Sequence, residues 1–166
     1  LSGACCGDLM RVWKPTDAEA SYAVYFEAVH SGDDDHYSAE QRRAWVPSPV
    51  VQEWWLPRLS AAKAWVTSDE HGLTGFISLR EDGYLDMFFV SSRARGDGTA
   101  IQLYDKLLEQ ARDSELGRLS THASHYLRPF LEKRGWQVMA KEVVTRLNVE
   151  MERFVMELPQ TDSQVS

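Results

Sequence analysis

The spacing of hydrophobic residues changes along the chain, and each change predicts a different kind of element. After Thr16 and Asp17, either of which can cap a helix, apolar side chains recur every three or four positions up to Ser31, which predicts a helix with one buried face. From residue 64 the apolar residues come instead in short runs between turn-forming residues, which predicts strands at 64–67, 73–79 and 84–90. Helical spacing returns over residues 98–112.

Weaker signals predict the remaining elements. The apolar run 9–13 ends before Pro15 and is expected to form a first strand, and Ser38 is a suitable cap for a helix over 38–45. In the C-terminal third we expect a strand at 118–123 and a helix at 124–134, which Gly135 ends. Three more strands are expected at 136–139, 143–147 and 153–158. This order of elements indicates an α+β fold with a mixed sheet.

Composition narrows the class of protein. The 166 residues are 43% hydrophobic and 26% charged, which is typical of one globular domain, and we expect frayed ends at 1–8 and 160–166. A net charge of −7 disfavours nucleic-acid binding, because neutralising phosphates requires clustered lysine and arginine. No apolar stretch approaches the ~20 residues that cross a bilayer, and the first residues do not resemble a signal peptide. Cys5 and Cys6 are adjacent and lack the spacing of zinc ligands, so we expect a cytoplasmic protein without a metal.

One junction carries the clearest chemical signal. The strand that ends at Val90 is followed by a polar spacer and by the run RGDGTA at 95–100, where a helix begins. The first N–H groups of a helix have no partner within it and lie at the positive end of its dipole, so this junction can bind an anion. A glycine-rich turn into a surface helix explains the same residues equally well.

Two familiar nucleotide-binding motifs do not fit this junction. A Walker loop needs a lysine directly after its second glycine, and the chain has none there. A Rossmann fingerprint needs a third glycine and belongs to the first strand–helix unit, whereas here that glycine is missing and helical segments come first.

The junction does resemble the pyrophosphate loop of the GNAT N-acetyltransferase superfamily. That motif is a strand ending in a small aliphatic residue, a short spacer and R/Q-x-x-G-x-G/A at a helix start. The corresponding residues here are Val90, the spacer SSRA, Arg95, Gly98 and Ala100. Residues 121–138, THASHYLRPFLEKRGWQV, are similar to the family's second signature of strand, polar cap, helix and glycine before an aromatic residue. The segments 33–45 and 156–158 resemble a small uncharacterised bacterial subgroup of the family.

The resemblance implies a fold and a cofactor. Members have a mixed, mostly antiparallel sheet with helices on both faces, and acetyl-CoA lies where two parallel strands splay apart, here 84–90 and 118–123. The first strand would pair with the pantetheine arm, the loop amides would hold the pyrophosphate, and Ser124 takes the place of the usual Asn beside the thiol, a role compatible with capping a helix. The implied cofactor-binding residues are Phe88, Phe89, Val90, Arg95, Gly96, Asp97, Gly98, Thr99, Ala100, Ile101 and Ser124.

Acetyl transfer to an amine also requires a proton acceptor and often an acid for the departing thiolate. The family usually supplies the acid from a Tyr at the position of Leu131, so Tyr126 is the nearest phenol here. Family members often place an acidic residue where this chain has Tyr84, and because side chains alternate along a strand, Asp86 shares its face. We expect Asp86 as the base, His122 as a second candidate and Tyr126 as a candidate acid. Each residue also has a non-catalytic explanation: Asp86 could form an ion pair, and Tyr126 could pack as an aromatic side chain.

The resemblance therefore predicts an N-acetyltransferase that moves an acetyl group from acetyl-CoA to a primary amine of a small molecule or protein, by direct attack in a ternary complex. We expect residues 30–45 with Trp54 and Trp55 to line the acceptor pocket, where the acidic residues would attract a cationic amine; these are Asp33, Asp34, Asp35 and Glu40. Because fold does not determine function, a non-catalytic acyl-CoA-binding or sensor domain, a transferase of another acyl group and an unrelated anion-binding module are alternatives. Family members often pair through their C-terminal strands, so the resemblance also favours a homodimer.

Overall fold

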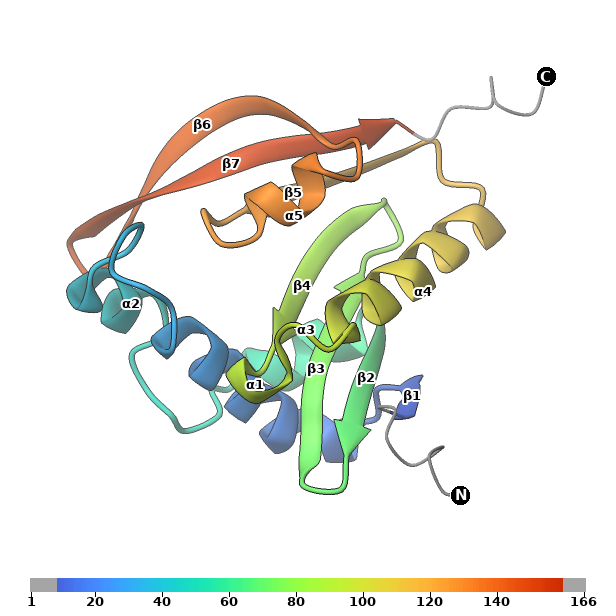
Figure 1. The fold of residues 1–166 in the computed structure, drawn as a ribbon, viewed down its shortest axis with the longest axis horizontal. Helices are drawn as coiled ribbons and strands as arrows, with labels where there is room; N and C mark the ends of the chain where they lie inside the picture. Colours follow the sequence, from blue (N-terminus) through green and yellow to red (C-terminus); the bar gives the residue numbers. More distant parts are fainter. Residues whose placement is uncertain (1–8, 160–166) are drawn as a thin grey trace.

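The computed structural model describes residues 9–159, so Cys5, Cys6 and the two ends expected to be frayed lie outside the described residues. Within this part of the chain seven strands form one sheet (Figure 1). They are β1 Leu9–Val12, β2 Lys63–Asp69, β3 Gly72–Leu79, β4 Tyr84–Val90, β5 Arg118–Ala123, β6 Gln137–Arg146 and β7 Val149–Pro159, in the spatial order β1-β2-β3-β4-β5-β7-β6. Neighbouring strands are antiparallel except β4 and β5, which confirms the predicted mixed, mostly antiparallel sheet.

Helices cover both faces of the sheet, as predicted (Figure 1). They are α1 Ala18–His30, α2 Ala39–Trp45, α3 Trp55–Ser60, α4 Thr99–Asp113 and α5 Arg128–Glu132. On one face α4 and α5 pack through Leu103 and Leu131 against a cluster that contains Ile77. On the other face α1 and α3 pack through Tyr22 and Trp55 against a cluster that contains Phe76. Successive residues of β3 thus enter different cores, as the alternation of side chains along a strand requires.

Three main differences separate the observed elements from the predicted ones. The helix expected over 124–134 is shortened to α5, because residues 124–127 form a turn in which the Ser124 hydroxyl accepts the amides of Tyr126 and Leu127, at 3.2 and 3.1 Å. The strands expected at 136–139 and 143–147 are one strand, β6, with a shift of register between Val138 and Ala140. No element was predicted where α3 lies, and its Pro57 is tolerated because the first turn of a helix has no intrahelical partner for that amide.

Strand β4 has two irregularities beside its parallel neighbour. It pairs with β5 only through Tyr84 with Ser120 and Leu85 with Thr121, and past this point no described residue of β4 pairs with β5. On its other side Ser78 pairs with Met87 while the next residue of β3, Leu79, pairs with Leu85. Asp86 is therefore the extra residue of a β-bulge, a feature that re-aims side chains and is common near functional sites.

Candidate active site

Two glycines give the loop between β4 and α4 its shape. Gly96 and Gly98 have φ angles of 85° and 91°, in the left-handed region that favours glycine. A Cβ atom built at either glycine would have no other atom within 4 Å, so the loop is open on these sides. The chain thus reaches the first turn of α4 in a conformation that leaves room beside its backbone.

Three backbone amides at the start of α4 have no hydrogen-bond partner among the described residues. The first amide to bond within the helix belongs to Gln102, which donates to the Gly98 carbonyl at 3.0 Å. The amides of Gly98, Ala100 and Ile101 have no hydrogen-bond partner among residues 9–159. Three free donors at the positive end of a 15-residue helix are able to bind an anion.

Two charged side chains hold this loop in place. The Arg95 guanidinium donates to the Ala28 carbonyl and the Ser31 hydroxyl, at 3.1 and 3.2 Å, and so ties the loop to the end of α1. The Asp97 carboxylate accepts the Thr99 amide at 3.1 Å and its hydroxyl at 2.6 Å. Both residues lie in the predicted loop, and their contacts fix its conformation.

A cavity of about 420 Å³, which we call the loop cavity, extends from this loop between the end of β4, the end of α1 and the segment 124–130 that follows β5. Six of the residues predicted to bind the cofactor line it, namely Phe88, Phe89, Val90, Arg95, Ala100 and Ser124. The other five, Gly96, Asp97, Gly98, Thr99 and Ile101, lie in the adjoining loop and the first turn of α4. The structure thus brings all eleven residues to one region.

A second cavity of about 450 Å³, the strand cavity, is lined by β4, β5 and the β6–β7 hairpin together with parts of α1, α2 and α3. The bulge in β4 turns Tyr84, Asp86 and Met87 toward it, and His122 on β5 faces the same space. Trp45, Phe89 and Ser124 line both cavities, so the two meet at these side chains. A molecule in each could therefore come into contact there.

Asp86 is held by an ion pair. Its side chain is 1% exposed, and Arg58 donates to both carboxylate oxygens at 2.9 and 2.8 Å. Arg80 lies 3.4 Å from one of the same oxygens. The hydrogen bond to Asp86 raises the pKa of Arg58. Both carboxylate oxygens of Asp86 are thus occupied by guanidinium groups, so the structure shows Asp86 as an ion-pair partner.

His122 has a different environment, which the sequence did not predict. Its Nδ1 lies 2.7 Å from the Tyr84 hydroxyl, and the two share a hydrogen bond. Burial and the charge of Arg153 lower the pKa of His122, while Glu142, 3.8 Å from Nε2, opposes this change. Burial raises the pKa of Tyr84. At neutral pH a neutral imidazole thus faces a protonated phenol, a pair that can accept one proton. One signal in the sequence could have identified Tyr84 as a site residue: by the resemblance, it stands where family members often carry an acidic residue.

Tyr126 lies in the loop cavity, and its hydroxyl donates to the Asp33 carbonyl at 2.9 Å. Burial raises its pKa. A Cβ at Gly32 would collide with this ring, so the close packing of Tyr126 on this turn requires a glycine at position 32. Leu131, at the family's usual Tyr position, is fully buried in the core.

The acidic residues expected around the acceptor, Asp33, Asp34, Asp35 and Glu40, do not line the strand cavity. Trp45 and Trp54 do line the strand cavity, but Trp55 is completely buried in the core. Asp33 lines the loop cavity instead, and Asp34 pairs with Arg42 at 2.9 Å. The charged residues that line the strand cavity are Arg58, Asp86, Arg146, Glu152 and Arg153.

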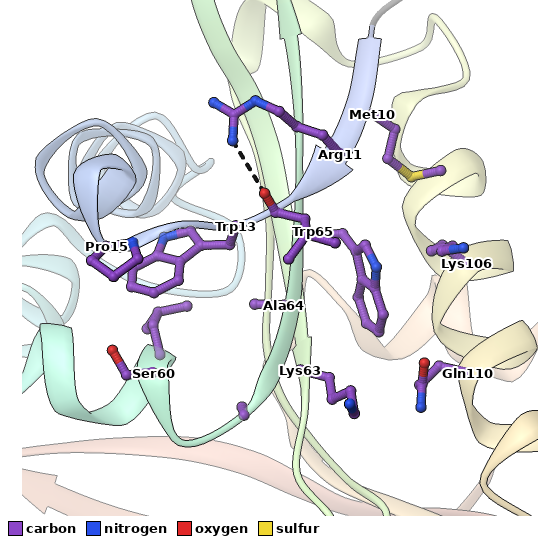
Figure 2. Close-up of a pocket in the computed structure, with 13 residues that line it drawn as sticks. Met10, Arg11, Trp13, Pro15, Ser60, Lys63, Ala64, Trp65, Lys106 and Gln110 are labelled. Atoms are coloured by element: carbon purple, nitrogen blue, oxygen red, sulfur yellow. Dashed lines mark hydrogen bonds between the residues drawn. The ribbon is translucent and has the colours of Figure 1, made fainter.

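A larger hollow of about 660 Å³ lies at the β1 edge of the sheet (Figure 2). Figure 2 shows Trp13 and Ser60 on one side of β2 and Trp65 and Lys106 on the other, so the hollow follows the edge of the sheet. None of the predicted site residues lines this hollow, so we do not assign the active site to it despite its larger volume.

A family model for an acetyltransferase (GNAT) domain matches residues 33–158. The chain belongs to the GNAT acetyltransferase family. A curated relative, the uncharacterised N-acetyltransferase YafP of Escherichia coli (strain K12), is 30% identical over 135 residues, which cover 81% of this chain and 85% of the relative. The resemblance found in the sequence and the expected acetyltransferase class are thereby confirmed.

Solved structures share the GNAT fold. A GCN5-related N-acetyltransferase from Rhodopseudomonas palustris superimposes with a TM-score of 0.83 at 25% identity, covering 92% of this chain and 95% of that one. PaiA N-acetyltransferase from Thermoplasma acidophilum, solved in complex with coenzyme A, gives 0.72 at 15% identity, covering 92% and 99%. Among residues 9–159 of this GNAT domain, no helix has the length and apolar character needed to cross a membrane, and no group of three metal-ligating side chains is placed to hold an ion.

Proposed function

We propose that this GNAT protein transfers the acetyl group of acetyl-CoA to a primary amine of a small molecule or protein, by direct attack within a ternary complex. One observation carries this proposal: the loop cavity and the strand cavity meet at Phe89 and Ser124. The first begins at the free amides of α4, and the second contains the Tyr84–His122 pair. A thioester donor and an amine acceptor can therefore approach each other from opposite sides.

The loop cavity suits acetyl-CoA, which when bound supplies an electrophilic thioester carbonyl. The amides of Gly98, Ala100 and Ile101 would bind the pyrophosphate, with Arg95 beside them. The backbone of β4 from Phe88 to Val90 has no strand partner toward β5 and can pair with the pantetheine arm. The coenzyme A bound to PaiA, which has the same fold, agrees with this assignment.

The Tyr84–His122 pair is the proton acceptor in this proposal. The amine nitrogen loses a proton when it becomes an amide, and that proton moves to the Tyr84 oxygen as the Tyr84 proton moves to His122 Nδ1. Glu142 stabilises the resulting imidazolium from the Nε2 side. Asp86 holds Arg58 in the wall instead of accepting the proton, because both of its oxygens are already bound.

Tyr126 has a positioning role in the same proposal. Its hydroxyl proton is donated to the Asp33 carbonyl, so it fastens the turn after α1 to the loop cavity. The thiolate of the product then leaves without protonation by Tyr126.

Acetyl-CoA should raise the melting temperature of the protein, and desulfo-CoA should do so to a similar degree. A ligand at a hundredfold its dissociation constant contributes about 2.7 kcal/mol, which for a chain of this size is a shift of roughly 5–10 °C. ATP and NAD serve as controls and should cause no comparable shift. An unchanged melting temperature at millimolar acetyl-CoA would contradict the proposed cofactor. A shift without thiol release in the presence of any amine would favour the non-catalytic sensor, and a larger shift with succinyl-CoA would favour another acyl donor.

We further propose that the protein is a cytoplasmic homodimer. Acetyl-CoA is a metabolite of the cell interior, which supports the location. β6 is an edge strand that exposes Val138, Met139 and Val143, and an apolar edge is a template for pairing with another copy. Light scattering should give the mass of a dimer for the native chain and of a monomer for Val143→Lys. A monomeric native chain would contradict this assembly.

A further inference from the structure

With one exception, the charged side chains that line the strand cavity are paired with opposite charges. The pairs are Arg58 with Asp86, Arg153 with Glu142 and Glu152 with Lys141, at 2.8, 2.9 and 3.3 Å. Arg146 lines the same cavity, but its side chain has neither an ion pair nor a hydrogen bond within residues 9–159. The cavity thus carries one uncompensated positive charge.

The position of Arg146 is well defined by the hairpin that carries it. It is the last residue of β6 and is followed by Leu147 and Asn148, whose φ angles of 51° and 64° are those of a tight two-residue turn. Figure 1 shows this end of the hairpin beside α2. The Gln41 side chain donates to the Glu150 carbonyl at 2.8 Å, and this bond fixes the hairpin to α2. The backbone at Arg146 is therefore fixed at this end of the cavity, and its exposed side chain lines the cavity.

The charge of Arg146 acts on the interior of the cavity. Burial raises the pKa of Tyr25 to about 12, and the positive charges of Arg146 and Arg58 oppose this rise. Of these two arginines, only Arg58 is neutralised by a carboxylate. The field at the Arg146 end of the cavity is thus positive and favours an anion.

We propose, on the basis of the transferase function above, that Arg146 binds a carboxylate on the acceptor, so that the substrate is an amine that also carries a remote carboxylate. The planar guanidinium can bind a carboxylate through two parallel hydrogen bonds. The amine of the same molecule lies at the Tyr84–His122 pair. The substrate is thereby oriented from both ends.

The register of the sheet separates these two ends. His122 pairs with Val155 and Arg146 pairs with Val149, so their levels are six residue steps apart along β7, about 20 Å of strand. The two side chains shorten this distance without closing it. The amine and the carboxylate must then be several bonds apart, and an α-amino acid is too short. Tyr25, Trp45 and Met151 line the space between, which suits an apolar middle section.

A series of straight-chain amino acids from glycine to aminooctanoate, each compared with the alkylamine of equal length, tests this inference. The native protein should prefer the longest amino acid over its alkylamine by roughly tenfold in kcat/KM. Arg146→Gln should raise KM for aminooctanoate by about tenfold, leave kcat nearly unchanged and leave the alkylamines unaffected. Arg146→Lys should restore part of the preference. Arg43→Gln is the matched control, since Arg43 is exposed on α2 and lines neither cavity.

Two outcomes would overturn the inference: equal use of both series by the native protein, or an equal loss for both in Arg146→Gln. The melting temperature of the CoA-loaded protein gives a second readout that needs no turnover. A melting-temperature shift with aminooctanoate that disappears in Arg146→Gln supports the carboxylate site, whether or not acetyl transfer occurs. Such a shift without acetyl transfer would contradict only the proposed transferase function. No shift and no transfer with any member of the series would overturn both.

Discussion

Changing His122 to glutamine should lower kcat by about 10²- to 10⁴-fold, the range that general acid–base catalysis contributes. Glutamine keeps a polar side chain at this position but cannot take up the proton that Tyr84 passes on. The affinity for acetyl-CoA should stay unchanged, because His122 lines the strand cavity and not the loop cavity. Turnover by thiol release and acetyl-CoA binding by calorimetry measure the two effects.

The pH dependence of kcat separates His122 from Asp86 as the base. The neutral imidazole is the active form, and its pKa is lowered below the ordinary value of about 6.5. Activity should therefore be retained at neutral pH and lost as the pH falls through that lowered value. The charged groups around the ring, Glu142 and Arg153, oppose each other in this shift. The acidic limb should vanish in His122→Gln and persist in Asp86→Asn, and the reverse result would return the role of base to Asp86.

Changing Gly98 to valine should weaken acetyl-CoA binding by about a hundredfold or more. At a φ of 91° a β-branched residue is strained by about 1–3 kcal/mol, so the loop must rearrange and displace the free amides of α4. Calorimetric titration with acetyl-CoA measures the change. The amine-binding side, which lies across Phe89 and Ser124, should keep its structure.

Gly72 offers a matched control for this change. Its φ is 123°, a Cβ there would also have no neighbour within 4 Å, and it is the first residue of β3, outside both cavities. Gly72→Val should lose a similar amount of stability to backbone strain while keeping the affinity for acetyl-CoA. Equal affinity in Gly98→Val and Gly72→Val would place the pyrophosphate elsewhere.

The fold could be predicted largely because its signals are local. The helical period over 98–112 corresponds to α4, and the glycines that precede it mark the site of the loop. The turn at Ser124 was not predicted, since a polar residue before a helical pattern looks the same whether the helix begins at once or four residues later. The bulge in β6 was missed because a shift of register depends on its partner, β7.

The part of the site to which we assign catalysis depends on contacts between distant segments. Asp86 was identified from its position in an apolar strand, but its partner, Arg58, lies on α3, which no sequence pattern indicated. Tyr84 and His122 meet only because β4 and β5 are parallel with Tyr84 opposite Ser120. Such a register is a property of the assembled sheet, so sequence reasoning could name His122 without finding the residue that gives it a role.

The bulge at Asp86 also bears on how this family can diversify. A residue that has no partner on β3 can be replaced without changing the ladder of Leu85 and Met87, which hold β4 in the sheet. Its contacts are with Arg58 and Arg80, outside the ladder, so an exchange at 86 needs a compensating change only at these side chains. Evolution can thus alter the wall of the strand cavity at one point while the backbone beside the loop cavity stays constant.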